Sequence, residues 1–301
     1  MKNILIATVA LGLSFLSAPV LADADFYGSV NVMVSNDDDA SGKAVLKAQN
    51  NGSKIGVEFS ETLVDAEGNS KGGLTGFGKI EVGVDADDSG SDTFDSRLAY
   101  VGVDAGAMGS VAAGRQANPG AGVSKTNIFN VYGGNATFKY ADRSSNSVKY
   151  SNSVGPVSIS AMGIIDGATG KEGLDVTDIS ASMDLGPVAL SGAMVNDRVN
   201  VIKYNIASAS IDVAGITLAG TYSYKDTATT DLTGLEYSAS TSIAGNTIAV
   251  SLQDKEGTGN YYTAGVSRDL SESLSTYAEY QLTDVDTGTD TTQMALGLKY
   301  S

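Results

Sequence analysis

The chain contains no cysteine and no histidine among its 301 residues. Without cysteine, no disulfide can stabilise the fold. Without histidine, Ser-His-Asp triads, histidine metal sites and histidine acid–base chemistry are excluded. Tryptophan is absent too, whereas 36 glycines and 14 tyrosines are present, a composition typical of strands and turns. We therefore predict a β-rich protein that is not an enzyme and holds no cofactor or metal.

Basic residues are scarce relative to acidic ones. The chain has 19 Lys and Arg against 35 Asp and Glu, a formal net charge of −16. Such an excess of negative charge repels the phosphates of nucleic acids and of anionic lipid headgroups. Nucleic acid is therefore excluded as a general partner.

The first 22 residues have the pattern of a secretory signal peptide. One cation, Lys2, precedes an apolar core at 4–16, and Val20 and Ala22 occupy the −3 and −1 positions of a signal peptidase site. The core is shorter than the 18 residues of a membrane-spanning helix. We expect 1–22 to be removed, with cleavage after Ala24 as the alternative, and 23–301 to form one domain.

Long uninterrupted apolar runs are absent after residue 22. The longest uncharged run, 237–253, is broken throughout by Ser, Thr, Asn and Gln. Its residues alternate between apolar and polar, which indicates a strand with two different faces. The same alternation predicts sixteen strands along the chain. They lie near residues 26–34, 54–62, 73–84, 96–103, 109–116, 138–151, 157–165, 176–184, 188–195, 200–211, 216–225, 234–243, 247–253, 261–268, 274–282 and 292–300.

The predicted connectors also alternate, between longer acidic loops and tight turns. NDDDASGKAVLKAQNNG (36–52) and DADDSGSDTF (85–94) are long, whereas SVGP, DLGP and IAGN are short. Long loops at one end and short turns at the other indicate an all-β fold, a 16-stranded antiparallel transmembrane up-and-down β-barrel. A secreted all-β adhesin built from sandwich domains is the alternative, because it would show similar strands. Two or three sandwich cores should contain buried aromatic residues, especially tryptophan, and this chain has no tryptophan.

The segment SRLAYVGVDAGAMGSVAAGRQ (96–116) carries an arginine near each end. Arg97 is expected in the water-filled lumen, because an arginine facing lipid at mid-depth costs ~2–4 kcal/mol. Alternation then places Ala99 and Val101 in the lumen with it and turns Leu98, Tyr100 and Gly102 to the lipid. The same reasoning puts further charges in the lumen: Lys54, Glu58, Lys79, Glu81 and Lys149.

Several segments, in order, resemble the general trimeric porins of Gram-negative outer membranes. They are FYGSVNVMVS, SKIGVEFSETL, SRLAYVGVDAGAMGSVAAGRQ, NSVKYSNSVGPVSISAMG, LSTYAEYQLTD and TTQMALGLKY. The resemblance covers essentially all of the chain after residue 22. It implies a homotrimer in the outer membrane, in contact with lipid and lipopolysaccharide, with its third loop, 117–137, folded into the pore.

The resemblance also implies roles for individual residues. Lys54 and Arg97 match basic wall residues of the pore constriction, Lys139 and Arg143 lie near a third such position, and Lys125 belongs to the third loop. Each could instead be an ordinary solvated charge. Relatives commonly place acidic residues in this loop, but 117–137 has none.

Arg115 alternates in step with Val111 and Ala113, which places it on the outward face of its strand. In similar porins this arginine contacts an acidic residue of a neighbouring subunit. Asp87 and Asp88 are the candidate partners here. Two acidic groups have weaker interpretations. Residues 284–290 (DVDTGTD) have calcium-like spacing without a closing glutamate, and 37–39 could meet divalent ions at lipopolysaccharide, but hydrated loops explain both.

The expected function is a passive diffusion channel for small hydrophilic solutes and ions across the outer membrane. A sugar-selective porin with Tyr27, Tyr261 and Tyr277 as aromatic rungs is the alternative within transport, and the adhesin is the alternative outside it. We expect weak anion preference at moderate and high salt, because the basic constriction acts in a narrow passage whereas the acidic mouth is screened. The acidic mouth is formed by loop residues Asp37–Asp39, Asp87, Asp88, Asp254, Glu256, Asp284, Asp286 and Asp290.

Overall fold

The computed structural model describes residues 23–38, 43–64, 70–87, 92–167 and 173–301, so the predicted signal peptide lies outside the described residues. Strands make up most of this part of the chain. They are β1 (Asp23–Asp38), β2 (Ala44–Asn50), β3 (Lys54–Val64), β4 (Ser70–Val84), β5 (Phe94–Asp104), β6 (Ser110–Ala117), β7 (Arg143–Val154), β8 (Val157–Ile164), β9 (Val176–Asp184), β10 (Val188–Asp197), β11 (Ile202–Val213), β12 (Ile216–Asp226), β13 (Asp231–Ile243), β14 (Asn246–Lys255), β15 (Gly259–Asp269), β16 (Leu274–Val285) and β17 (Thr291–Tyr300).

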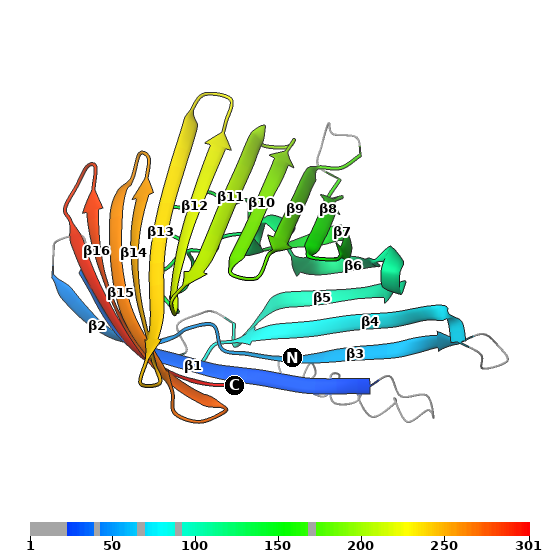
Figure 1. Ribbon diagram of the computed structural model, residues 1–301, viewed down its shortest axis with the longest axis horizontal. Coiled ribbons are helices and arrows are strands. Elements are labelled where there is room, and N and C mark those ends of the chain that lie inside the picture. The colour runs from blue at the N-terminus through cyan, green and yellow to red at the C-terminus, as the bar shows by residue number, and fades with distance from the viewer. Residues whose placement is uncertain (1–22, 39–42, 65–69, 88–91, 168–172) are drawn as a thin grey trace.

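The strands form one closed antiparallel barrel. From β3 to β17, each strand pairs with the next along the chain, and Figure 1 shows them succeeding one another around a single curved wall. The last strand, β17, pairs with β1 and closes the wall. Within the described residues, β2 and β3 share one position, so the seventeen strands fill sixteen positions. The predicted 16-stranded barrel is confirmed.

The strand β2 lies where the sequence predicted only loop. Its residues pair with the second half of β1, from Val32 opposite Asn50 to Asp38 opposite Ala44. The first half of β1 pairs instead with β3, from Asp23 opposite Ser60. The prediction of an acidic loop over 36–52 was therefore wrong for 44–50, because the long first strand offers these residues a ladder of hydrogen bonds.

Each strand has an apolar face and a polar face. On β17, Met294, Leu296, Leu298 and Tyr300 are exposed by 49–61%, whereas Ala295 between them is buried. Lipid accepts only apolar side chains, so the exposed apolar face is the outer one. The opposite, inner face of the wall carries most of the buried serine, threonine, glutamine and carboxylate side chains.

A β-bulge at Arg97 changes the predicted faces of β5. Glu81 pairs with Leu98, whereas Val82 pairs with Ser96, so Arg97 is an extra residue in β5. Arg97 and Leu98 therefore both belong to the inner face. Beyond the bulge the predicted assignment is reversed: Val101 and Val103 are exposed outside, and the face that pairs with the inner residues of β4 is the one with Leu98, Tyr100 and Gly102.

The connectors at one end of the barrel are tight, as predicted. Ala214 and Gly215, and likewise Ala244 and Gly245, have positive φ angles at both positions, the geometry of a two-residue hairpin turn. We call this end the short-turn end. At the opposite end, the connectors 198–201, 227–230 and 256–258 are also short, so long loops do not recur around the whole barrel.

The longest described connector, residues 118–142, joins β6 to β7. The predicted strand 138–151 begins only at Arg143, because Phe138 donates its N–H to Ser223 Oγ and packs in an apolar cluster. Its apolar cluster contains Met162, Ile164, Val176, Val195 and Tyr204. Two short 3-10 helices, η1 (Gly106–Met108) and η2 (Pro119–Gly122), interrupt the strands. Among the described residues, no helix has the length and apolar content to cross a bilayer.

Candidate functional site in the barrel interior

A buried carboxylate joins the two basic wall residues that the sequence singled out. Glu81 on β4 has only 3% of its side chain exposed. Its Oε1 lies 2.6 Å from Arg97 Nε, and its Oε2 lies 3.3 Å from Lys54 Nζ. Tyr27 donates its hydroxyl to the same Oε2 at 2.8 Å. Glu81 is thereby the centre of a hydrogen-bonded group on β1, β3, β4 and β5.

The same group includes a second ion pair and stacked cations. Lys79 Nζ lies 2.5 Å from Glu58 Oε1 and 4.6 Å from the centroid of the Tyr27 ring, a cation–π distance. Gly56 makes room for that ring, since a Cβ there would lie 2.5 Å from it. We call these residues the charged wall: Tyr27, Lys54, Glu58, Lys79, Glu81 and Arg97.

The charged wall differs from the basic wall that the sequence suggested. Its three cations, Lys54, Lys79 and Arg97, face two carboxylates, so its formal charge is one positive rather than three. Alternation had placed Glu58 and Glu81 in the lumen but had not paired them. The strand register was the missing information: it sets Glu58 opposite Lys79 and Glu81 beside the Arg97 bulge.

Residues 118–142 are held by carboxylates on the inner face of three distant strands. On β9, Asp178 accepts the N–H of Gly120 at 3.0 Å. Glu236 on β13 accepts the N–H groups of Ala136 and Thr137. On β16, Glu279 accepts three consecutive N–H groups, those of 130–132, at 2.6, 2.9 and 3.1 Å. All three carboxylates are at most 5% exposed.

Further contacts extend this segment to the first strands of the barrel. Asn51, between β2 and β3, donates its amide to the carbonyl of Asn130 at 3.2 Å. Tyr132 donates its hydroxyl to Asp37 on β1 at 3.1 Å. Burial, together with the Asp37 carboxylate, raises the pKa of the Tyr132 phenol, which therefore stays a hydrogen-bond donor. The segment thus bridges inner-face positions from β9 around to β1.

The structure places the remaining basic candidates in or beside this segment. Lys125 donates its backbone N–H to Ser208 Oγ on β11 at 2.8 Å. Lys139 lies 2.5 Å from Asp142, so it pairs locally. Arg143 is the first residue of β7. Of these three, Lys139 alone has an ion pair among the described residues.

Arg115 lies on the outer face, as its parity predicted. It bonds to the carbonyl of Ser96 at 3.2 Å and to the hydroxyl of Ser145 at 3.0 Å. Asp87 accepts the N–H of Asn50 at 2.7 Å, and Asp88 lies outside the described residues. These contacts orient Arg115 along the outer surface of the barrel.

The acidic residues of the mouth make local contacts. Asp38 accepts the N–H and the hydroxyl of Thr292, and Asp290 accepts the N–H of Val285. Among the described residues, no group of three or more acidic side chains is arranged to hold a metal ion. Asp39, part of the proposed divalent-ion group, is outside the described residues.

A closed barrel with an apolar outer face and a charged inner wall matches one family of proteins. The family model described as Gram-negative porin matches residues 7–288. The chain belongs to the Gram-negative porin family. Membership makes it a passive diffusion channel of the outer membrane, as the sequence predicted.

Solved structures of outer-membrane proteins share its fold. OmpF of Salmonella typhi, in complex with daunomycin, superposes with a TM-score of 0.76 at 18% identity, over 93% of this chain and 97% of that one. A trimer form of Vibrio cholerae OmpT gives 0.70 at 16% identity, over 93% and 99%. A mutant porin of Rh. blastica gives 0.70 at 12% identity, over 92% and 99%. A comparison with curated proteins found no match.

Proposed function

We propose that residues 118–142 fold into the pore of this porin and form its narrowest part against the charged wall. The hydrogen bonds from Asp178, Glu236 and Glu279 to the backbone of this segment carry the proposal. In this proposal the segment follows the inner face of β9 to β16, and the passage lies between the segment and β3 to β5. Solutes would be selected there by size and by charge.

The charges around this passage are close to balanced. Lys54, Lys79, Arg97 and Lys125 supply positive charge; the negative charge comes from Glu58 and Glu81 in the charged wall and from Asp178, Glu236 and Glu279 behind the segment. The segment contains no acidic residue between 117 and 137. The negative charge on that side of the passage therefore comes from the three carboxylates that bind its backbone. The anion preference expected from the sequence is therefore reduced, and we propose weak selectivity at high salt.

At low salt the acidic mouth adds to this balance. Its carboxylates lie in wide water, where their field reaches only ~8–10 Å at ordinary ionic strength. The field reaches farther as the salt is diluted, because screening weakens. Cations would then be concentrated at the entrance. We propose that cation preference grows as salt is lowered.

The assembly we propose is a homotrimer, as in the trimer form described for OmpT. Arg115 supports this assembly because it is a charged residue on the outer face, where contact with a neighbouring subunit would satisfy it better than lipid. Asp87 and Asp88 remain the proposed partners. Outer-membrane lipid and lipopolysaccharide would surround the trimer.

The porin would perform no chemical reaction, and small hydrophilic solutes would cross it passively. The secreted adhesin is not compatible with membership of the porin family. The sugar-selective alternative predicted a ladder of tyrosines, but Tyr27 and Tyr277 make different contacts: Tyr27 bonds to Glu81 and Tyr277 to Asn31 and Asn51. Neither is arranged as a free stacking platform.

Reversal potentials in planar bilayers test this function directly. Purified porin should give stepwise conductance, with a reversal potential near zero across a gradient at high salt. Across a gradient of dilute salt solutions, the reversal potential should shift towards the equilibrium potential of the cation. A strong preference for one ion at high salt would contradict the balanced constriction, and absence of conductance steps would contradict a channel.

A further inference from the structure

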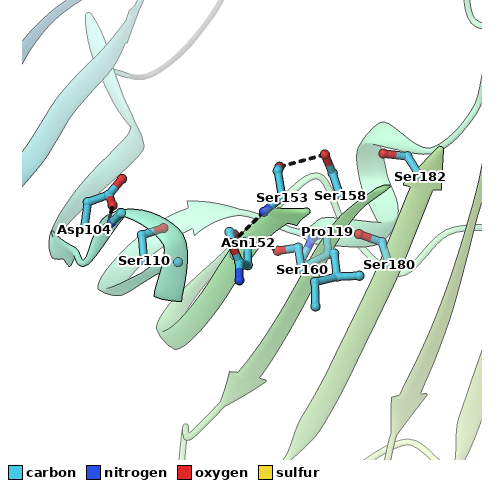
Figure 2. A pocket seen from close by; sticks show the side chains of 13 residues that line it. Asp104, Ser110, Pro119, Asn152, Ser153, Ser158, Ser160, Ser180 and Ser182 are labelled. Atoms are coloured by element: carbon cyan, nitrogen blue, oxygen red, sulfur yellow. Dashed lines mark hydrogen bonds between the residues drawn. The ribbon is translucent and has the colours of Figure 1, made fainter. Parts of the chain in front are cut away.

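A recess of about 520 Å³ opens in the inner wall next to η2, at the start of residues 118–142. Seven serines line it. One is Ser110 on β6, and the other six lie on the adjacent strands β7, β8 and β9: Ser151, Ser153, Ser158, Ser160, Ser180 and Ser182. Figure 2 shows Ser153, Ser158, Ser160, Ser180 and Ser182 near Pro119, with Ser110 farther away on the side of Asp104. The volume lies within the ~300–1,000 Å³ of pockets that hold small ligands.

Strand register arranges the six serines of β7 to β9 as two rows. Ser151 pairs with Ser160, which pairs with Ser180. In the next row, Ser153 pairs with Ser158, which pairs with Ser182. Neighbouring strands are about 4.8 Å apart, and alternate residues of a strand are about 6.7 Å apart, so the wall presents a regular grid of hydroxyl groups.

The hydroxyls of this grid are not equivalent. Those of Ser151 and Ser160 bond to each other at 3.0 Å, and those of Ser153 and Ser158 at 2.8 Å. Ser180 and Ser182, on β9, make no side-chain hydrogen bond within the described part of the chain. Their hydroxyls can therefore bond to a solute without breaking a contact of the protein.

Pro119, the first residue of η2, borders the recess. The N–H of Gly120 points at the Asp178 carboxylate, 3.0 and 3.1 Å from its two oxygens. A few residues on, Ser191 donates its hydroxyl to the carbonyl of Val123 at 2.5 Å. These bonds hold η2 and the residues after it in place at the edge of the recess.

The lining of the recess selects a ligand class. Asp104 is its one charged residue among the described residues, and serine hydroxyls are the commonest polar groups, beside the apolar side chains of Pro119 and Ile159. Each hydroxyl both donates and accepts hydrogen bonds, which matches a solute that also carries many hydroxyls. We infer that the recess is a binding subsite for small neutral polyhydroxylated solutes, such as disaccharides. This inference rests on the proposed function, because the solute reaches the recess through the pore.

Sucrose titration of single-channel current tests the subsite. In wild-type porin, sucrose should reduce the ion current saturably, beyond the effect of viscosity. The double variant Ser180→Ala, Ser182→Ala should need at least threefold more sucrose for half of the effect, with unchanged current in its absence. Ser182→Leu, which fills the recess, should abolish the saturable component.

Two controls make the result specific. Ser267→Ala removes an inner-face serine on β15 outside the recess and should leave the sucrose response unchanged. Polyethylene glycol of similar mass accepts hydrogen bonds but has few hydroxyls, so it should reduce current equally in wild type and variants. Normal channels with the same sucrose response in all variants would overturn the subsite alone, whereas absence of channels would overturn the proposed function and the subsite together.

Discussion

At the scale of single residues, the main finding is how Glu81 combines with its neighbours. One nearly buried carboxylate bonds to an arginine, a lysine and a tyrosine from three other strands. A buried charge is tolerated only when such partners replace water. The arrangement lowers the positive charge that Arg97 and Lys54 present to a passing ion, and it holds both side chains in fixed positions along the wall.

Replacing Glu81 with glutamine should therefore increase anion preference. In water, a unit charge about 8 Å from an ion contributes about 0.5 kcal/mol, which is a factor of about two in permeability ratio. We expect an increase of that order in reversal-potential measurements at high salt. Glu272→Gln, in the connector between β15 and β16, is the matched control and should have little effect. An unchanged ratio in Glu81→Gln would show that ions do not pass close to the charged wall.

At the scale of elements, the bulge in β5 decides which side chains line the pore. Because Arg97 is an extra residue, the strand on either side of it keeps regular pairing with β4. Bulges insert one residue and re-aim side chains without ending a strand. Here the bulge lets Arg97 and Leu98, consecutive in sequence, belong to the same inner face.

Deleting Arg97 should consequently leave the barrel intact. Ser96 and Leu98 would become neighbours with the alternation that their partners Val82 and Glu81 already have. We expect unchanged β-content by circular dichroism. The difference in mobility between unheated and heated samples on SDS gels should also be unchanged. Deleting Ala249 instead removes a residue from β14, which has unbroken register with both of its neighbours. That deletion should prevent assembly, because one half of the strand would turn its faces over. If both deletions behave alike, the bulge has no structural role.

The carboxylate anchors give a second prediction at this scale. Glu279 accepts N–H groups from 130–132, and hydrogen bonds to charged groups contribute about 1.5–3 kcal/mol each. The substitution Glu279→Gln removes the negative charge and replaces one accepting oxygen with an NH2 group. That group cannot accept the backbone N–H groups of 130–132. We expect noisier open-channel currents as residues 118–142 loosen, measured in single channels with Glu272→Gln as control. Quiet currents in Glu279→Gln would mean that other contacts suffice.

At the scale of the whole molecule, the outer surface has to satisfy both lipid and neighbouring subunits. Most of its exposed large side chains are apolar, such as Val30, Val101 and Leu296. Arg115 departs from that rule, and its bonds to Ser96 and Ser145 hold it along the surface. We propose that this charge contacts another copy of the chain.

Arg115→Ala should therefore lower the temperature at which the proposed trimer dissociates, without changing β-content. Semi-native SDS gels over a temperature series measure this. Asp87→Asn keeps an acceptor for the N–H of Asn50 while removing the charge, and a double-mutant cycle with Arg115→Ala should show coupling. Asp88→Ala serves as the parallel variant. Trimers of Arg115→Ala that melt like wild type would leave this arginine as a solvated charge on a single barrel.

The sequence by itself determined the barrel, its sixteen wall positions and the channel function. Lipid imposes a period of two on every outer face, so alternation survives in the sequence and identifies strands such as 292–300 without any contact being known. Only the tertiary structure decided the rest. The Arg97 bulge reverses the inferred faces of Leu98 and Tyr100 because parity cannot show where an extra residue is inserted. The pairing of β2 with β1 and the anchors Glu236 and Glu279 join residues far apart in the chain, and local patterns carry no record of contacts that the closed barrel creates.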